Sequence, residues 1–226
     1  LLAAEGRLLD RARTLTAPTV PLATVEKITS RPDAEGRMLG EDQADALMKV
    51  AVSGRMLDVL VGPAGAGKTT AMSALRRAWE KEHGAGSVVG LAPSAVAAQV
   101  LADDLGIATE NTAKWWQNHI MYGTTFTAGQ LVIIDEATLA GTLTLDRLTA
   151  LAAEAGAKVL LVGDHAQLHH GADIGDQAGR GAGGGGEYPR CRVSPSHRGN
   201  SAAGPARNRV HPAGWIPSAR ARATFS

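Results

Sequence analysis

The strongest sign of chemistry in the chain is one short stretch, residues 62–70, which reads Gly-Pro-Ala-Gly-Ala-Gly-Lys-Thr-Thr. A glycine, four residues, a glycine, a lysine and a threonine form the pattern of a phosphate-binding loop. Glycines let backbone N–H groups surround a phosphate at the start of a helix. Lys68 can then reach the β- and γ-phosphates of a nucleotide, and the Thr69 hydroxyl can bind Mg²⁺. A flexible Gly/Ala turn would not explain the apolar run before the loop, so we predict nucleotide binding.

Two acids, Asp135 and Glu136, follow the apolar run Leu131–Ile134. A carboxylate at the end of a strand can hold Mg²⁺, and its neighbour can activate the water that attacks a phosphate. Two solvated acids are the ordinary alternative, but their place after a phosphate loop favours a nucleotide hydrolase. A further run, Val159–Val162, leads to Gln167, whose amide could contact the γ-phosphate or the attacking water.

These side chains need a scaffold, and the chain between residues 57 and 168 alternates apolar runs with helical patterns. Such an alternation predicts an α/β fold with a parallel sheet and helices on both faces, which binds ligands at the carboxyl ends of its strands. The predicted strands are Leu57–Val61, Val88–Ala92, Leu131–Ile134 and Val159–Val162, and the predicted helices are Thr69–His83, Ser94–Leu105, Thr112–Ile120 and Thr142–Ala155.

The segments on either side of this domain have different compositions. Residues 1–56 predict a helical lead-in, with helices over 1–16 and Glu41–Ser53 and a shorter helical or irregular piece over Val25–Ser30. Residues 169–226 are rich in Gly, Arg and Pro, and from residue 171 onward eight Arg stand against three acids with no Leu, Met or Lys. This composition predicts a disordered basic tail that touches nucleic acid, or the product of a shifted reading frame in a GC-rich gene. We favour the second interpretation.

Composition sets the remaining bounds on this chain of 226 residues with a net charge of +1. Its single cysteine, Cys191, excludes an intrachain disulfide and favours a cytoplasmic location. No run approaches the roughly 18 apolar residues of a membrane span, and no secretory signal opens the chain, so we expect no membrane partner. Because the sequence begins at Leu1 and not at Met, we expect a fragment of a longer protein.

Taken together, the stretches Gly62–Thr70, Val132–Ala137 and Gly163–Leu168 resemble motifs I, II and III of superfamily 1 helicases, most closely those of the RecD-like branch. Residues 87–98 and 109–116 resemble the helicase part of actinobacterial conjugative relaxases of the MobF (TraA/TrwC-like) class. The resemblance covers residues 1–168 and implies a RecA-like P-loop NTPase domain over residues 57–168.

The resemblance also implies roles for individual residues. ATP phosphates would be held by Gly65, Ala66, Gly67, Lys68, Thr69 and Thr70, and adenine would be read by Gln43. Thr69 and Asp135 would bind Mg²⁺, Glu136 would be the general base, and Gln167 would couple the γ-phosphate to DNA. Single-stranded DNA would pass Pro93, Ser94, Thr112 and Lys114. Trp115 and Trp116 could stack a base or pack in the core, and neighbouring helix positions face different ways, so at least one should be buried.

The sequence departs from this family after Leu168, where no second α/β pattern follows. Motors of this class divide their ATP site between two RecA-like domains, and the loss of an arginine supplied by a partner can cost roughly 10³–10⁵ in turnover. The main hypothesis is therefore the first motor domain of an ATP-dependent DNA helicase that lacks its second domain. The alternative is a truncated, non-catalytic nucleotide-binding module. A small-molecule kinase or another P-loop ATPase ranks third, because Gly163–Leu168 argues against it.

Overall fold

The computed structural model describes residues 1–63, 65–163 and 191–192. All of them belong to one compact unit, Leu1–Ser196. Residues 169–190 and 193–226 of the predicted tail lie outside the described residues, so the disorder predicted for the tail stays a prediction.

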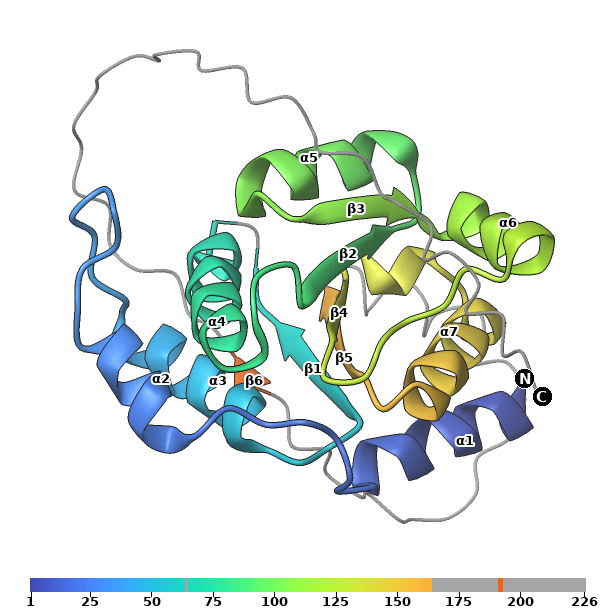
Figure 1. The fold of residues 1–226 in the computed structure, drawn as a ribbon, viewed down its shortest axis with the longest axis horizontal. Helices are drawn as coiled ribbons and strands as arrows, with labels where there is room; N and C mark the ends of the chain where they lie inside the picture. The colour runs from blue at the N-terminus through green and yellow to red at the C-terminus, as the bar shows by residue number, and fades with distance from the viewer. Residues whose placement is uncertain (64, 164–190, 193–226) are drawn as a thin grey trace, which may run out of the picture. The chain divides into compact units, whose positions relative to one another are not determined.

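The described residues form helices on both faces of one sheet (Figure 1). The helices are α1 (Leu2–Arg13), α2 (Leu22–Thr29), α3 (Glu41–Val52), α4 (Lys68–His83), α5 (Ala95–Leu105), α6 (Thr112–Tyr122) and α7 (Thr142–Glu154), with a 3-10 helix η1 (Ala137–Leu139). The strands are β1 (Leu57–Val61), β2 (Val88–Ala92), β3 (Ala108–Asn111), β4 (Leu131–Ile134), β5 (Lys158–Gly163) and β6 (Cys191–Arg192).

The sheet has the strand order β3-β2-β4-β5-β1-β6, and every pair of neighbours is parallel. β5 lies between β1 and β4, with Val61 opposite Gly163 and Ile134 opposite Leu161. The ends of these three strands therefore lie at one edge of the sheet, which brings the phosphate loop and the two acids together. The predicted α/β class, with a parallel sheet and helices on both faces, is confirmed.

Two apolar clusters fill the two faces, because side chains alternate along each strand. Ile133 and Leu160 pack in the first cluster with α2, α3, α4 and α5. Val132 and Val159 pack in the second with α6 and α7, and α1 adds half-buried side chains there. Both clusters fix the direction of the strands, and hence the placement of the loops at their carboxyl ends.

The N-terminal segment joins this core in two places. α2 and α3 contribute Val25, Leu47 and Val50 to the first cluster, each no more than 2% exposed. α1 lies along α7 on the other face, as Figure 1 shows, and ion pairs join the two helices. Among the residues that the structure describes, no helix has both the length and the apolar character needed to span a bilayer.

Candidate nucleotide site

The loop between β1 and α4 has the backbone geometry of an anion cradle. Gly65 and Gly67 adopt left-handed conformations with φ of 76° and 77°, which side chains rarely tolerate. Ala66 between them is 1% exposed, and α4 begins directly after Gly67. The first N–H groups of a helix have no partner within it and carry the positive end of its dipole. The N-terminus of α4, with Lys68, Thr69 and Thr70 in its first turn, is therefore suited to bind phosphate.

Lys68 folds back over this loop. Its Nζ donates hydrogen bonds to the backbone carbonyl oxygens of Gly62 at 2.5 Å and Pro63 at 3.2 Å. The ammonium thus lies beside the loop, and its charge also acts on Asp135 at the end of β4. The charge of Lys68 in motif I is therefore felt by the carboxyl of Asp135 in motif II.

Asp135 and Glu136 form a tight turn after β4. The Asp135 N–H still donates to the carbonyl of Leu91 at 2.9 Å, so the ladder with β2 extends one residue beyond the strand. The Glu136 N–H donates to Asp135 Oδ1 at 2.9 Å. The pKa of the Asp135 carboxyl is raised, because the effect of burial is larger than the opposing effects of the Glu136 N–H and the charge of Lys68. A half-buried carboxylate at the end of a central strand is suited to hold a divalent cation.

Glu136 has a backbone conformation that the sequence does not reveal. Its φ is 47°, and it is the one non-glycine residue with a left-handed φ in the described part of the chain. Strain of this kind persists where the surrounding structure imposes it, and it is concentrated at functional sites. This observation favours a functional carboxylate over an ordinary solvated acid.

Gln43, the predicted adenine-reading residue, lies in the first turn of α3 and is 6% exposed. Its side-chain amide contacts the phosphate loop itself, where Nε2 donates to the carbonyl of Ala66 at 3.3 Å. Gln167 lies outside the described residues, so its role stays a prediction.

The four residues of the predicted DNA path lie at the carboxyl ends of the neighbouring strands β2 and β3. Pro93 and Ser94 follow β2, and the exposed Ser94 caps α5 by accepting from the Ala97 N–H at 3.0 Å. Thr112 begins α6 and is 6% exposed, whereas the exposed Lys114 forms an ion pair with Glu110 at 2.7 Å. Their DNA contacts stay predictions, and the burial of Thr112 leaves its side chain little surface to offer.

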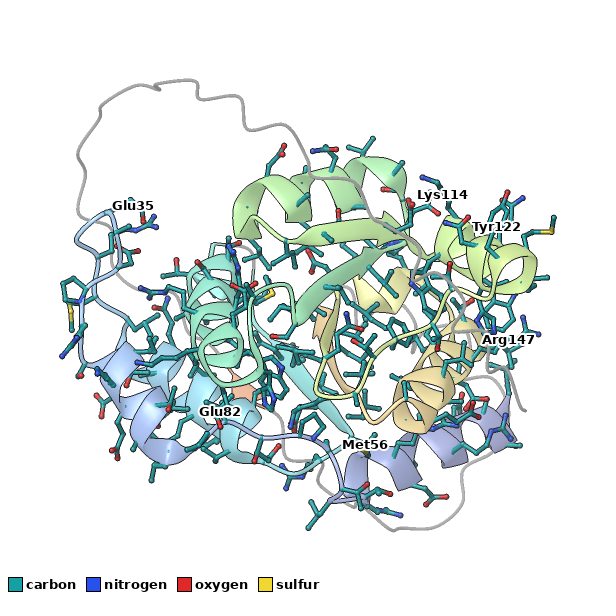
Figure 2. The ribbon with its side chains drawn as sticks, in the orientation of Figure 1. Glu35, Met56, Glu82, Lys114, Tyr122 and Arg147 are labelled. Atoms are coloured by element: carbon teal, nitrogen blue, oxygen red, sulfur yellow. The ribbon has the colours of Figure 1, made fainter. Side chains whose placement is uncertain are left out.

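The two adjacent tryptophans have different environments. Trp115 is 4% exposed and stacks on Phe126 with ring centroids 4.3 Å apart, which confirms that at least one of the pair is buried. Trp116 is half-buried, and the Arg147 guanidinium carbon lies 5.3 Å from its ring centroid. Figure 2 shows Arg147 on α7 and Lys114 on α6. Sequence reasoning missed Arg147, because no local pattern links residues 31 positions apart.

Residues 38–172, more than half of the chain, match the family model described as an AAA domain, and the chain belongs to this family. This match confirms the predicted likeness to RecD-like helicase motors, and the relatives described next confirm the predicted likeness to TraA-like conjugation proteins.

Two proteins with similar sequences are named as conjugal transfer proteins. The conjugal transfer protein TraA of Rhizobium radiobacter is 38% identical over 131 residues, and a protein of Sinorhizobium fredii named as a probable conjugal transfer protein TraA is 37% identical over 131 residues. Each match spans 58% of this chain but only 12% of the relative. The UvsW helicase from bacteriophage T4 superposes with a TM-score of 0.48 and 14% identity, over 66% of this chain and 62% of that chain.

Proposed function

We propose that this chain is the first motor domain of an ATP-dependent DNA helicase that acts on single-stranded DNA, within a conjugative relaxase. The observation that carries the proposal is that a left-handed glycine loop at a helix N-terminus, after β1, and a strained acid turn, after β4, lie at the same end of the sheet with only β5 between their strands. The names of the conjugation relatives, of whose length this chain matches 12%, support the biological setting.

The proposed roles follow from the chemistry of each group. The N–H groups of residues 65–70 bind the triphosphate, and Lys68 exchanges its carbonyl partners for phosphate oxygens. Thr69 and Asp135 hold Mg²⁺, which neutralises charge that develops on the phosphates. Glu136 accepts the proton of the attacking water. The left-handed glycines and the half-buried Asp135 fit these ligands.

The phosphate-loop proposal is tested by nucleotide binding. Titration of a fluorescent ATP analogue with Mg²⁺ should give saturable binding to the chain and a much weaker signal with Lys68→Ala. An equal signal from both proteins would contradict the proposal. Tripling the salt concentration serves as a further check, because binding of a triphosphate by Lys68 must weaken as charges are screened.

Hydrolysis is tested separately, because a motor of this class takes arginines from a second RecA-like domain. Phosphate release is measured with and without single-stranded DNA. DNA-stimulated release that disappears in Glu136→Gln would support a working motor domain. Nucleotide binding without release would support the alternative, a nucleotide-binding module that needs the second domain for turnover.

The proposed DNA path predicts a salt effect at Lys114. A lysine that neutralises one phosphate of a single strand adds about 0.7 to the slope of log affinity against log salt. Lys114→Ala should lower that slope by this amount. Lys81→Ala is the matched control, since Lys81 is exposed in the last turn of α4. Equal slopes for all three proteins would remove Lys114 from the path.

A further inference from the structure

Trp116 of α6 and Arg147 of α7 form a contact at the surface of the protein. The Arg147 guanidinium carbon lies over the Trp116 ring, 5.3 Å from its centroid. Arg147 is exposed and Trp116 is half-buried, so the arginine is the outer member of the pair. A cation at this distance is attracted by the face of an indole, which helps to hold the long arginine side chain in place. Figure 2 marks Arg147 on the side of the molecule that also carries Lys114 and Tyr122 of α6.

Among the residues that the structure describes, no carboxylate forms an ion pair with Arg147. Its neighbour Asp146 instead pairs with Arg7 at 2.5 Å and with Arg11 at 2.7 Å, both on α1. An arginine offers five N–H donors in a fixed plane and keeps its charge at every physiological pH. The positive charge of Arg147 is therefore available to an anion that comes from outside this part of the chain.

Exposed apolar side chains flank this pair on both helices. Ile120 follows Trp116 by one turn of α6, and Leu143 precedes Arg147 by one turn of α7, so each shares a helix face with its neighbour. Ile120 is 65% exposed and Leu143 is 52% exposed. The surface thus combines an indole, uncovered apolar side chains and an available cation. A planar aromatic group that carries a negative charge fits this combination, and a nucleotide of a single strand is such a group.

The pair also lies close to the proposed DNA path. Trp116 is one turn after Thr112 on α6, so these two residues share a helix face. Lys114, between them, points to another side of the helix, because residues two positions apart do not face each other. A strand that crosses the first two turns of α6 would therefore meet Lys114 on one side and the Trp116–Arg147 pair on the other.

We propose that the Trp116–Arg147 pair is a platform on which a base of single-stranded DNA stacks. The inference rests on the proposed motor function and adds a binding site to its DNA path. The base lies on the outer face of the Arg147 guanidinium, whose N–H groups donate to an adjacent phosphate. Trp116 holds the guanidinium from the protein side, so the arginine loses little freedom when the base binds. Because every base has an aromatic face, the platform does not select a sequence.

The test separates the bases of the strand from its phosphates. Fluorescence anisotropy gives the affinities of the chain for a labelled strand of thymidines and for a labelled strand of the same length in which every residue is abasic. Arg147→Lys keeps the charge but removes the planar guanidinium. It should weaken binding of the thymidine strand about tenfold and leave binding of the abasic strand nearly unchanged. Equal affinities of Arg147→Lys and the unmodified chain for thymidines would overturn the inference, because a phosphate contact needs only the charge.

Two further variants complete the comparison. Trp116→Leu removes the ring that holds the guanidinium and should reproduce the loss for thymidines, and the exposed Arg147→Lys keeps the test decisive if Trp116→Leu folds poorly. Arg31→Lys is the matched control, since Arg31 is exposed and has no ion pair within the described residues, and it should bind both strands like the unmodified chain.

Two other outcomes would also overturn the inference. One is an equal loss for both strands in Arg147→Lys, which would show a phosphate contact without a stacked base. The other is an unmodified chain that binds neither strand, which would refute the whole proposed DNA path and leave the nucleotide site standing if Mg·ATP still binds. Binding of thymidines that depends on Arg147, in a chain that binds no Mg·ATP, would support the platform and refute only the proposed nucleotide site.

Discussion

Glu136, the proposed general base, has a strained backbone. Its left-handed φ of 47° is held by two hydrogen bonds, from its N–H to Asp135 Oδ1 and from the Leu139 N–H to its carbonyl, both 2.9 Å. For a residue other than glycine, such a conformation costs of order 1 kcal/mol. The fold keeps a carboxylate here although glycine would fit the backbone better.

Replacing this residue should therefore separate stability from activity. Glu136→Gly relieves the strain and should raise the free energy of unfolding by about 1 kcal/mol while removing the proposed base. Glu136→Gln is the matched control, because it keeps the strain and loses the charge. Urea unfolding of the three proteins measures the difference. If Glu136→Gly and Glu136→Gln had the same stability, the strain would have no energetic weight.

A second residue of interest is Lys158, which begins β5 and has no exposed surface. Its Nζ lies 2.8 Å from Asp58 Oδ2 and donates to the carbonyl of Ser53 at 2.5 Å. Asp58, on β1, is 5% exposed and also accepts from the Ser53 hydroxyl at 2.6 Å. The charges compensate each other at the amino ends of two central strands.

Breaking this pair from one side should be costly. Lys158→Met leaves Arg55, at 3.7 Å, as the one cation paired with the buried Asp58 carboxylate among the residues that the structure describes, and should lower the free energy of unfolding by about 3–5 kcal/mol. The double variant Lys158→Met with Asp58→Asn removes both charges and should recover much of that loss. Urea unfolding compares them. A double variant no more stable than the single one would show that packing, and not the unpaired charge, sets the cost.

Among whole elements, α1 depends on a charged contact with α7. Asp146 accepts from Arg7 Nη2 at 2.5 Å and from Arg11 Nη1 at 2.7 Å, and Arg11 also reaches the Thr149 hydroxyl at 3.1 Å. The hydrogen bonds from Arg7, followed by those from Arg11 and the charges of both, lower the pKa of the Asp146 carboxyl against the effect of burial. Apolar packing of Leu8 and Ala12 supplements these pairs.

The lowered pKa of Asp146 predicts how α1 responds to acid. A carboxyl whose pKa is lower in the folded state adds stability above its unfolded value, about 3.9, and this is lost as the pH falls through the folded pKa. The difference in melting temperature between the chain and Asp146→Asn should therefore be full at pH 7 and shrink below about pH 4. Asp10→Asn, an exposed position on α1, should show no such difference. A constant difference down to pH 2 would contradict the prediction.

Elements with a strong apolar signal could be predicted from the sequence, and β3 shows the limit. β1, β2 and β4 have the predicted bounds, and α4 and α7 differ from theirs by one residue, because their core-facing residues repeat regularly. Ala108–Asn111 has no apolar run, since β3 lies at the edge of the sheet and is only half-buried. None of the four strands predicted from the sequence covers these residues. Exposure at an edge removes the pattern on which such predictions depend.

The site shows the same limit in another form. The spacing of Lys68 and Thr69 after the glycines is local, so the sequence could predict the loop. The contact of Gln43 with Ala66 joins residues 23 positions apart, and the pairs of Asp146 with Arg7 and Arg11 join residues 139 and 135 positions apart; only the fold brings them together. The left-handed backbone of Glu136 likewise depends on its neighbours in space.

At the scale of the whole molecule, the proposed nucleotide site is part of the core. β1 lies between β5 and β6 and enters the loop, and α4 leaves the loop to pack in the first apolar cluster. Leu57 on the same strand belongs to the second cluster. A ligand held at the start of α4 is therefore connected through β1 to both faces of the sheet.

This connection predicts that Mg·ATP stabilises the whole described fold. A ligand at 100 times its dissociation constant adds about 2.7 kcal/mol to the folded state, which corresponds to a rise in melting temperature of about 5–11 °C for a domain of this size. Lys68→Ala at the same concentrations, and the chain with Mg²⁺ alone, should show almost no rise. Hydrogen exchange with and without Mg·ATP then locates the effect, because protection should spread over β1, β4 and β5 together. Increased protection confined to the loop, with unchanged exchange in the strands, would mean that the site binds nucleotide without stabilising the sheet.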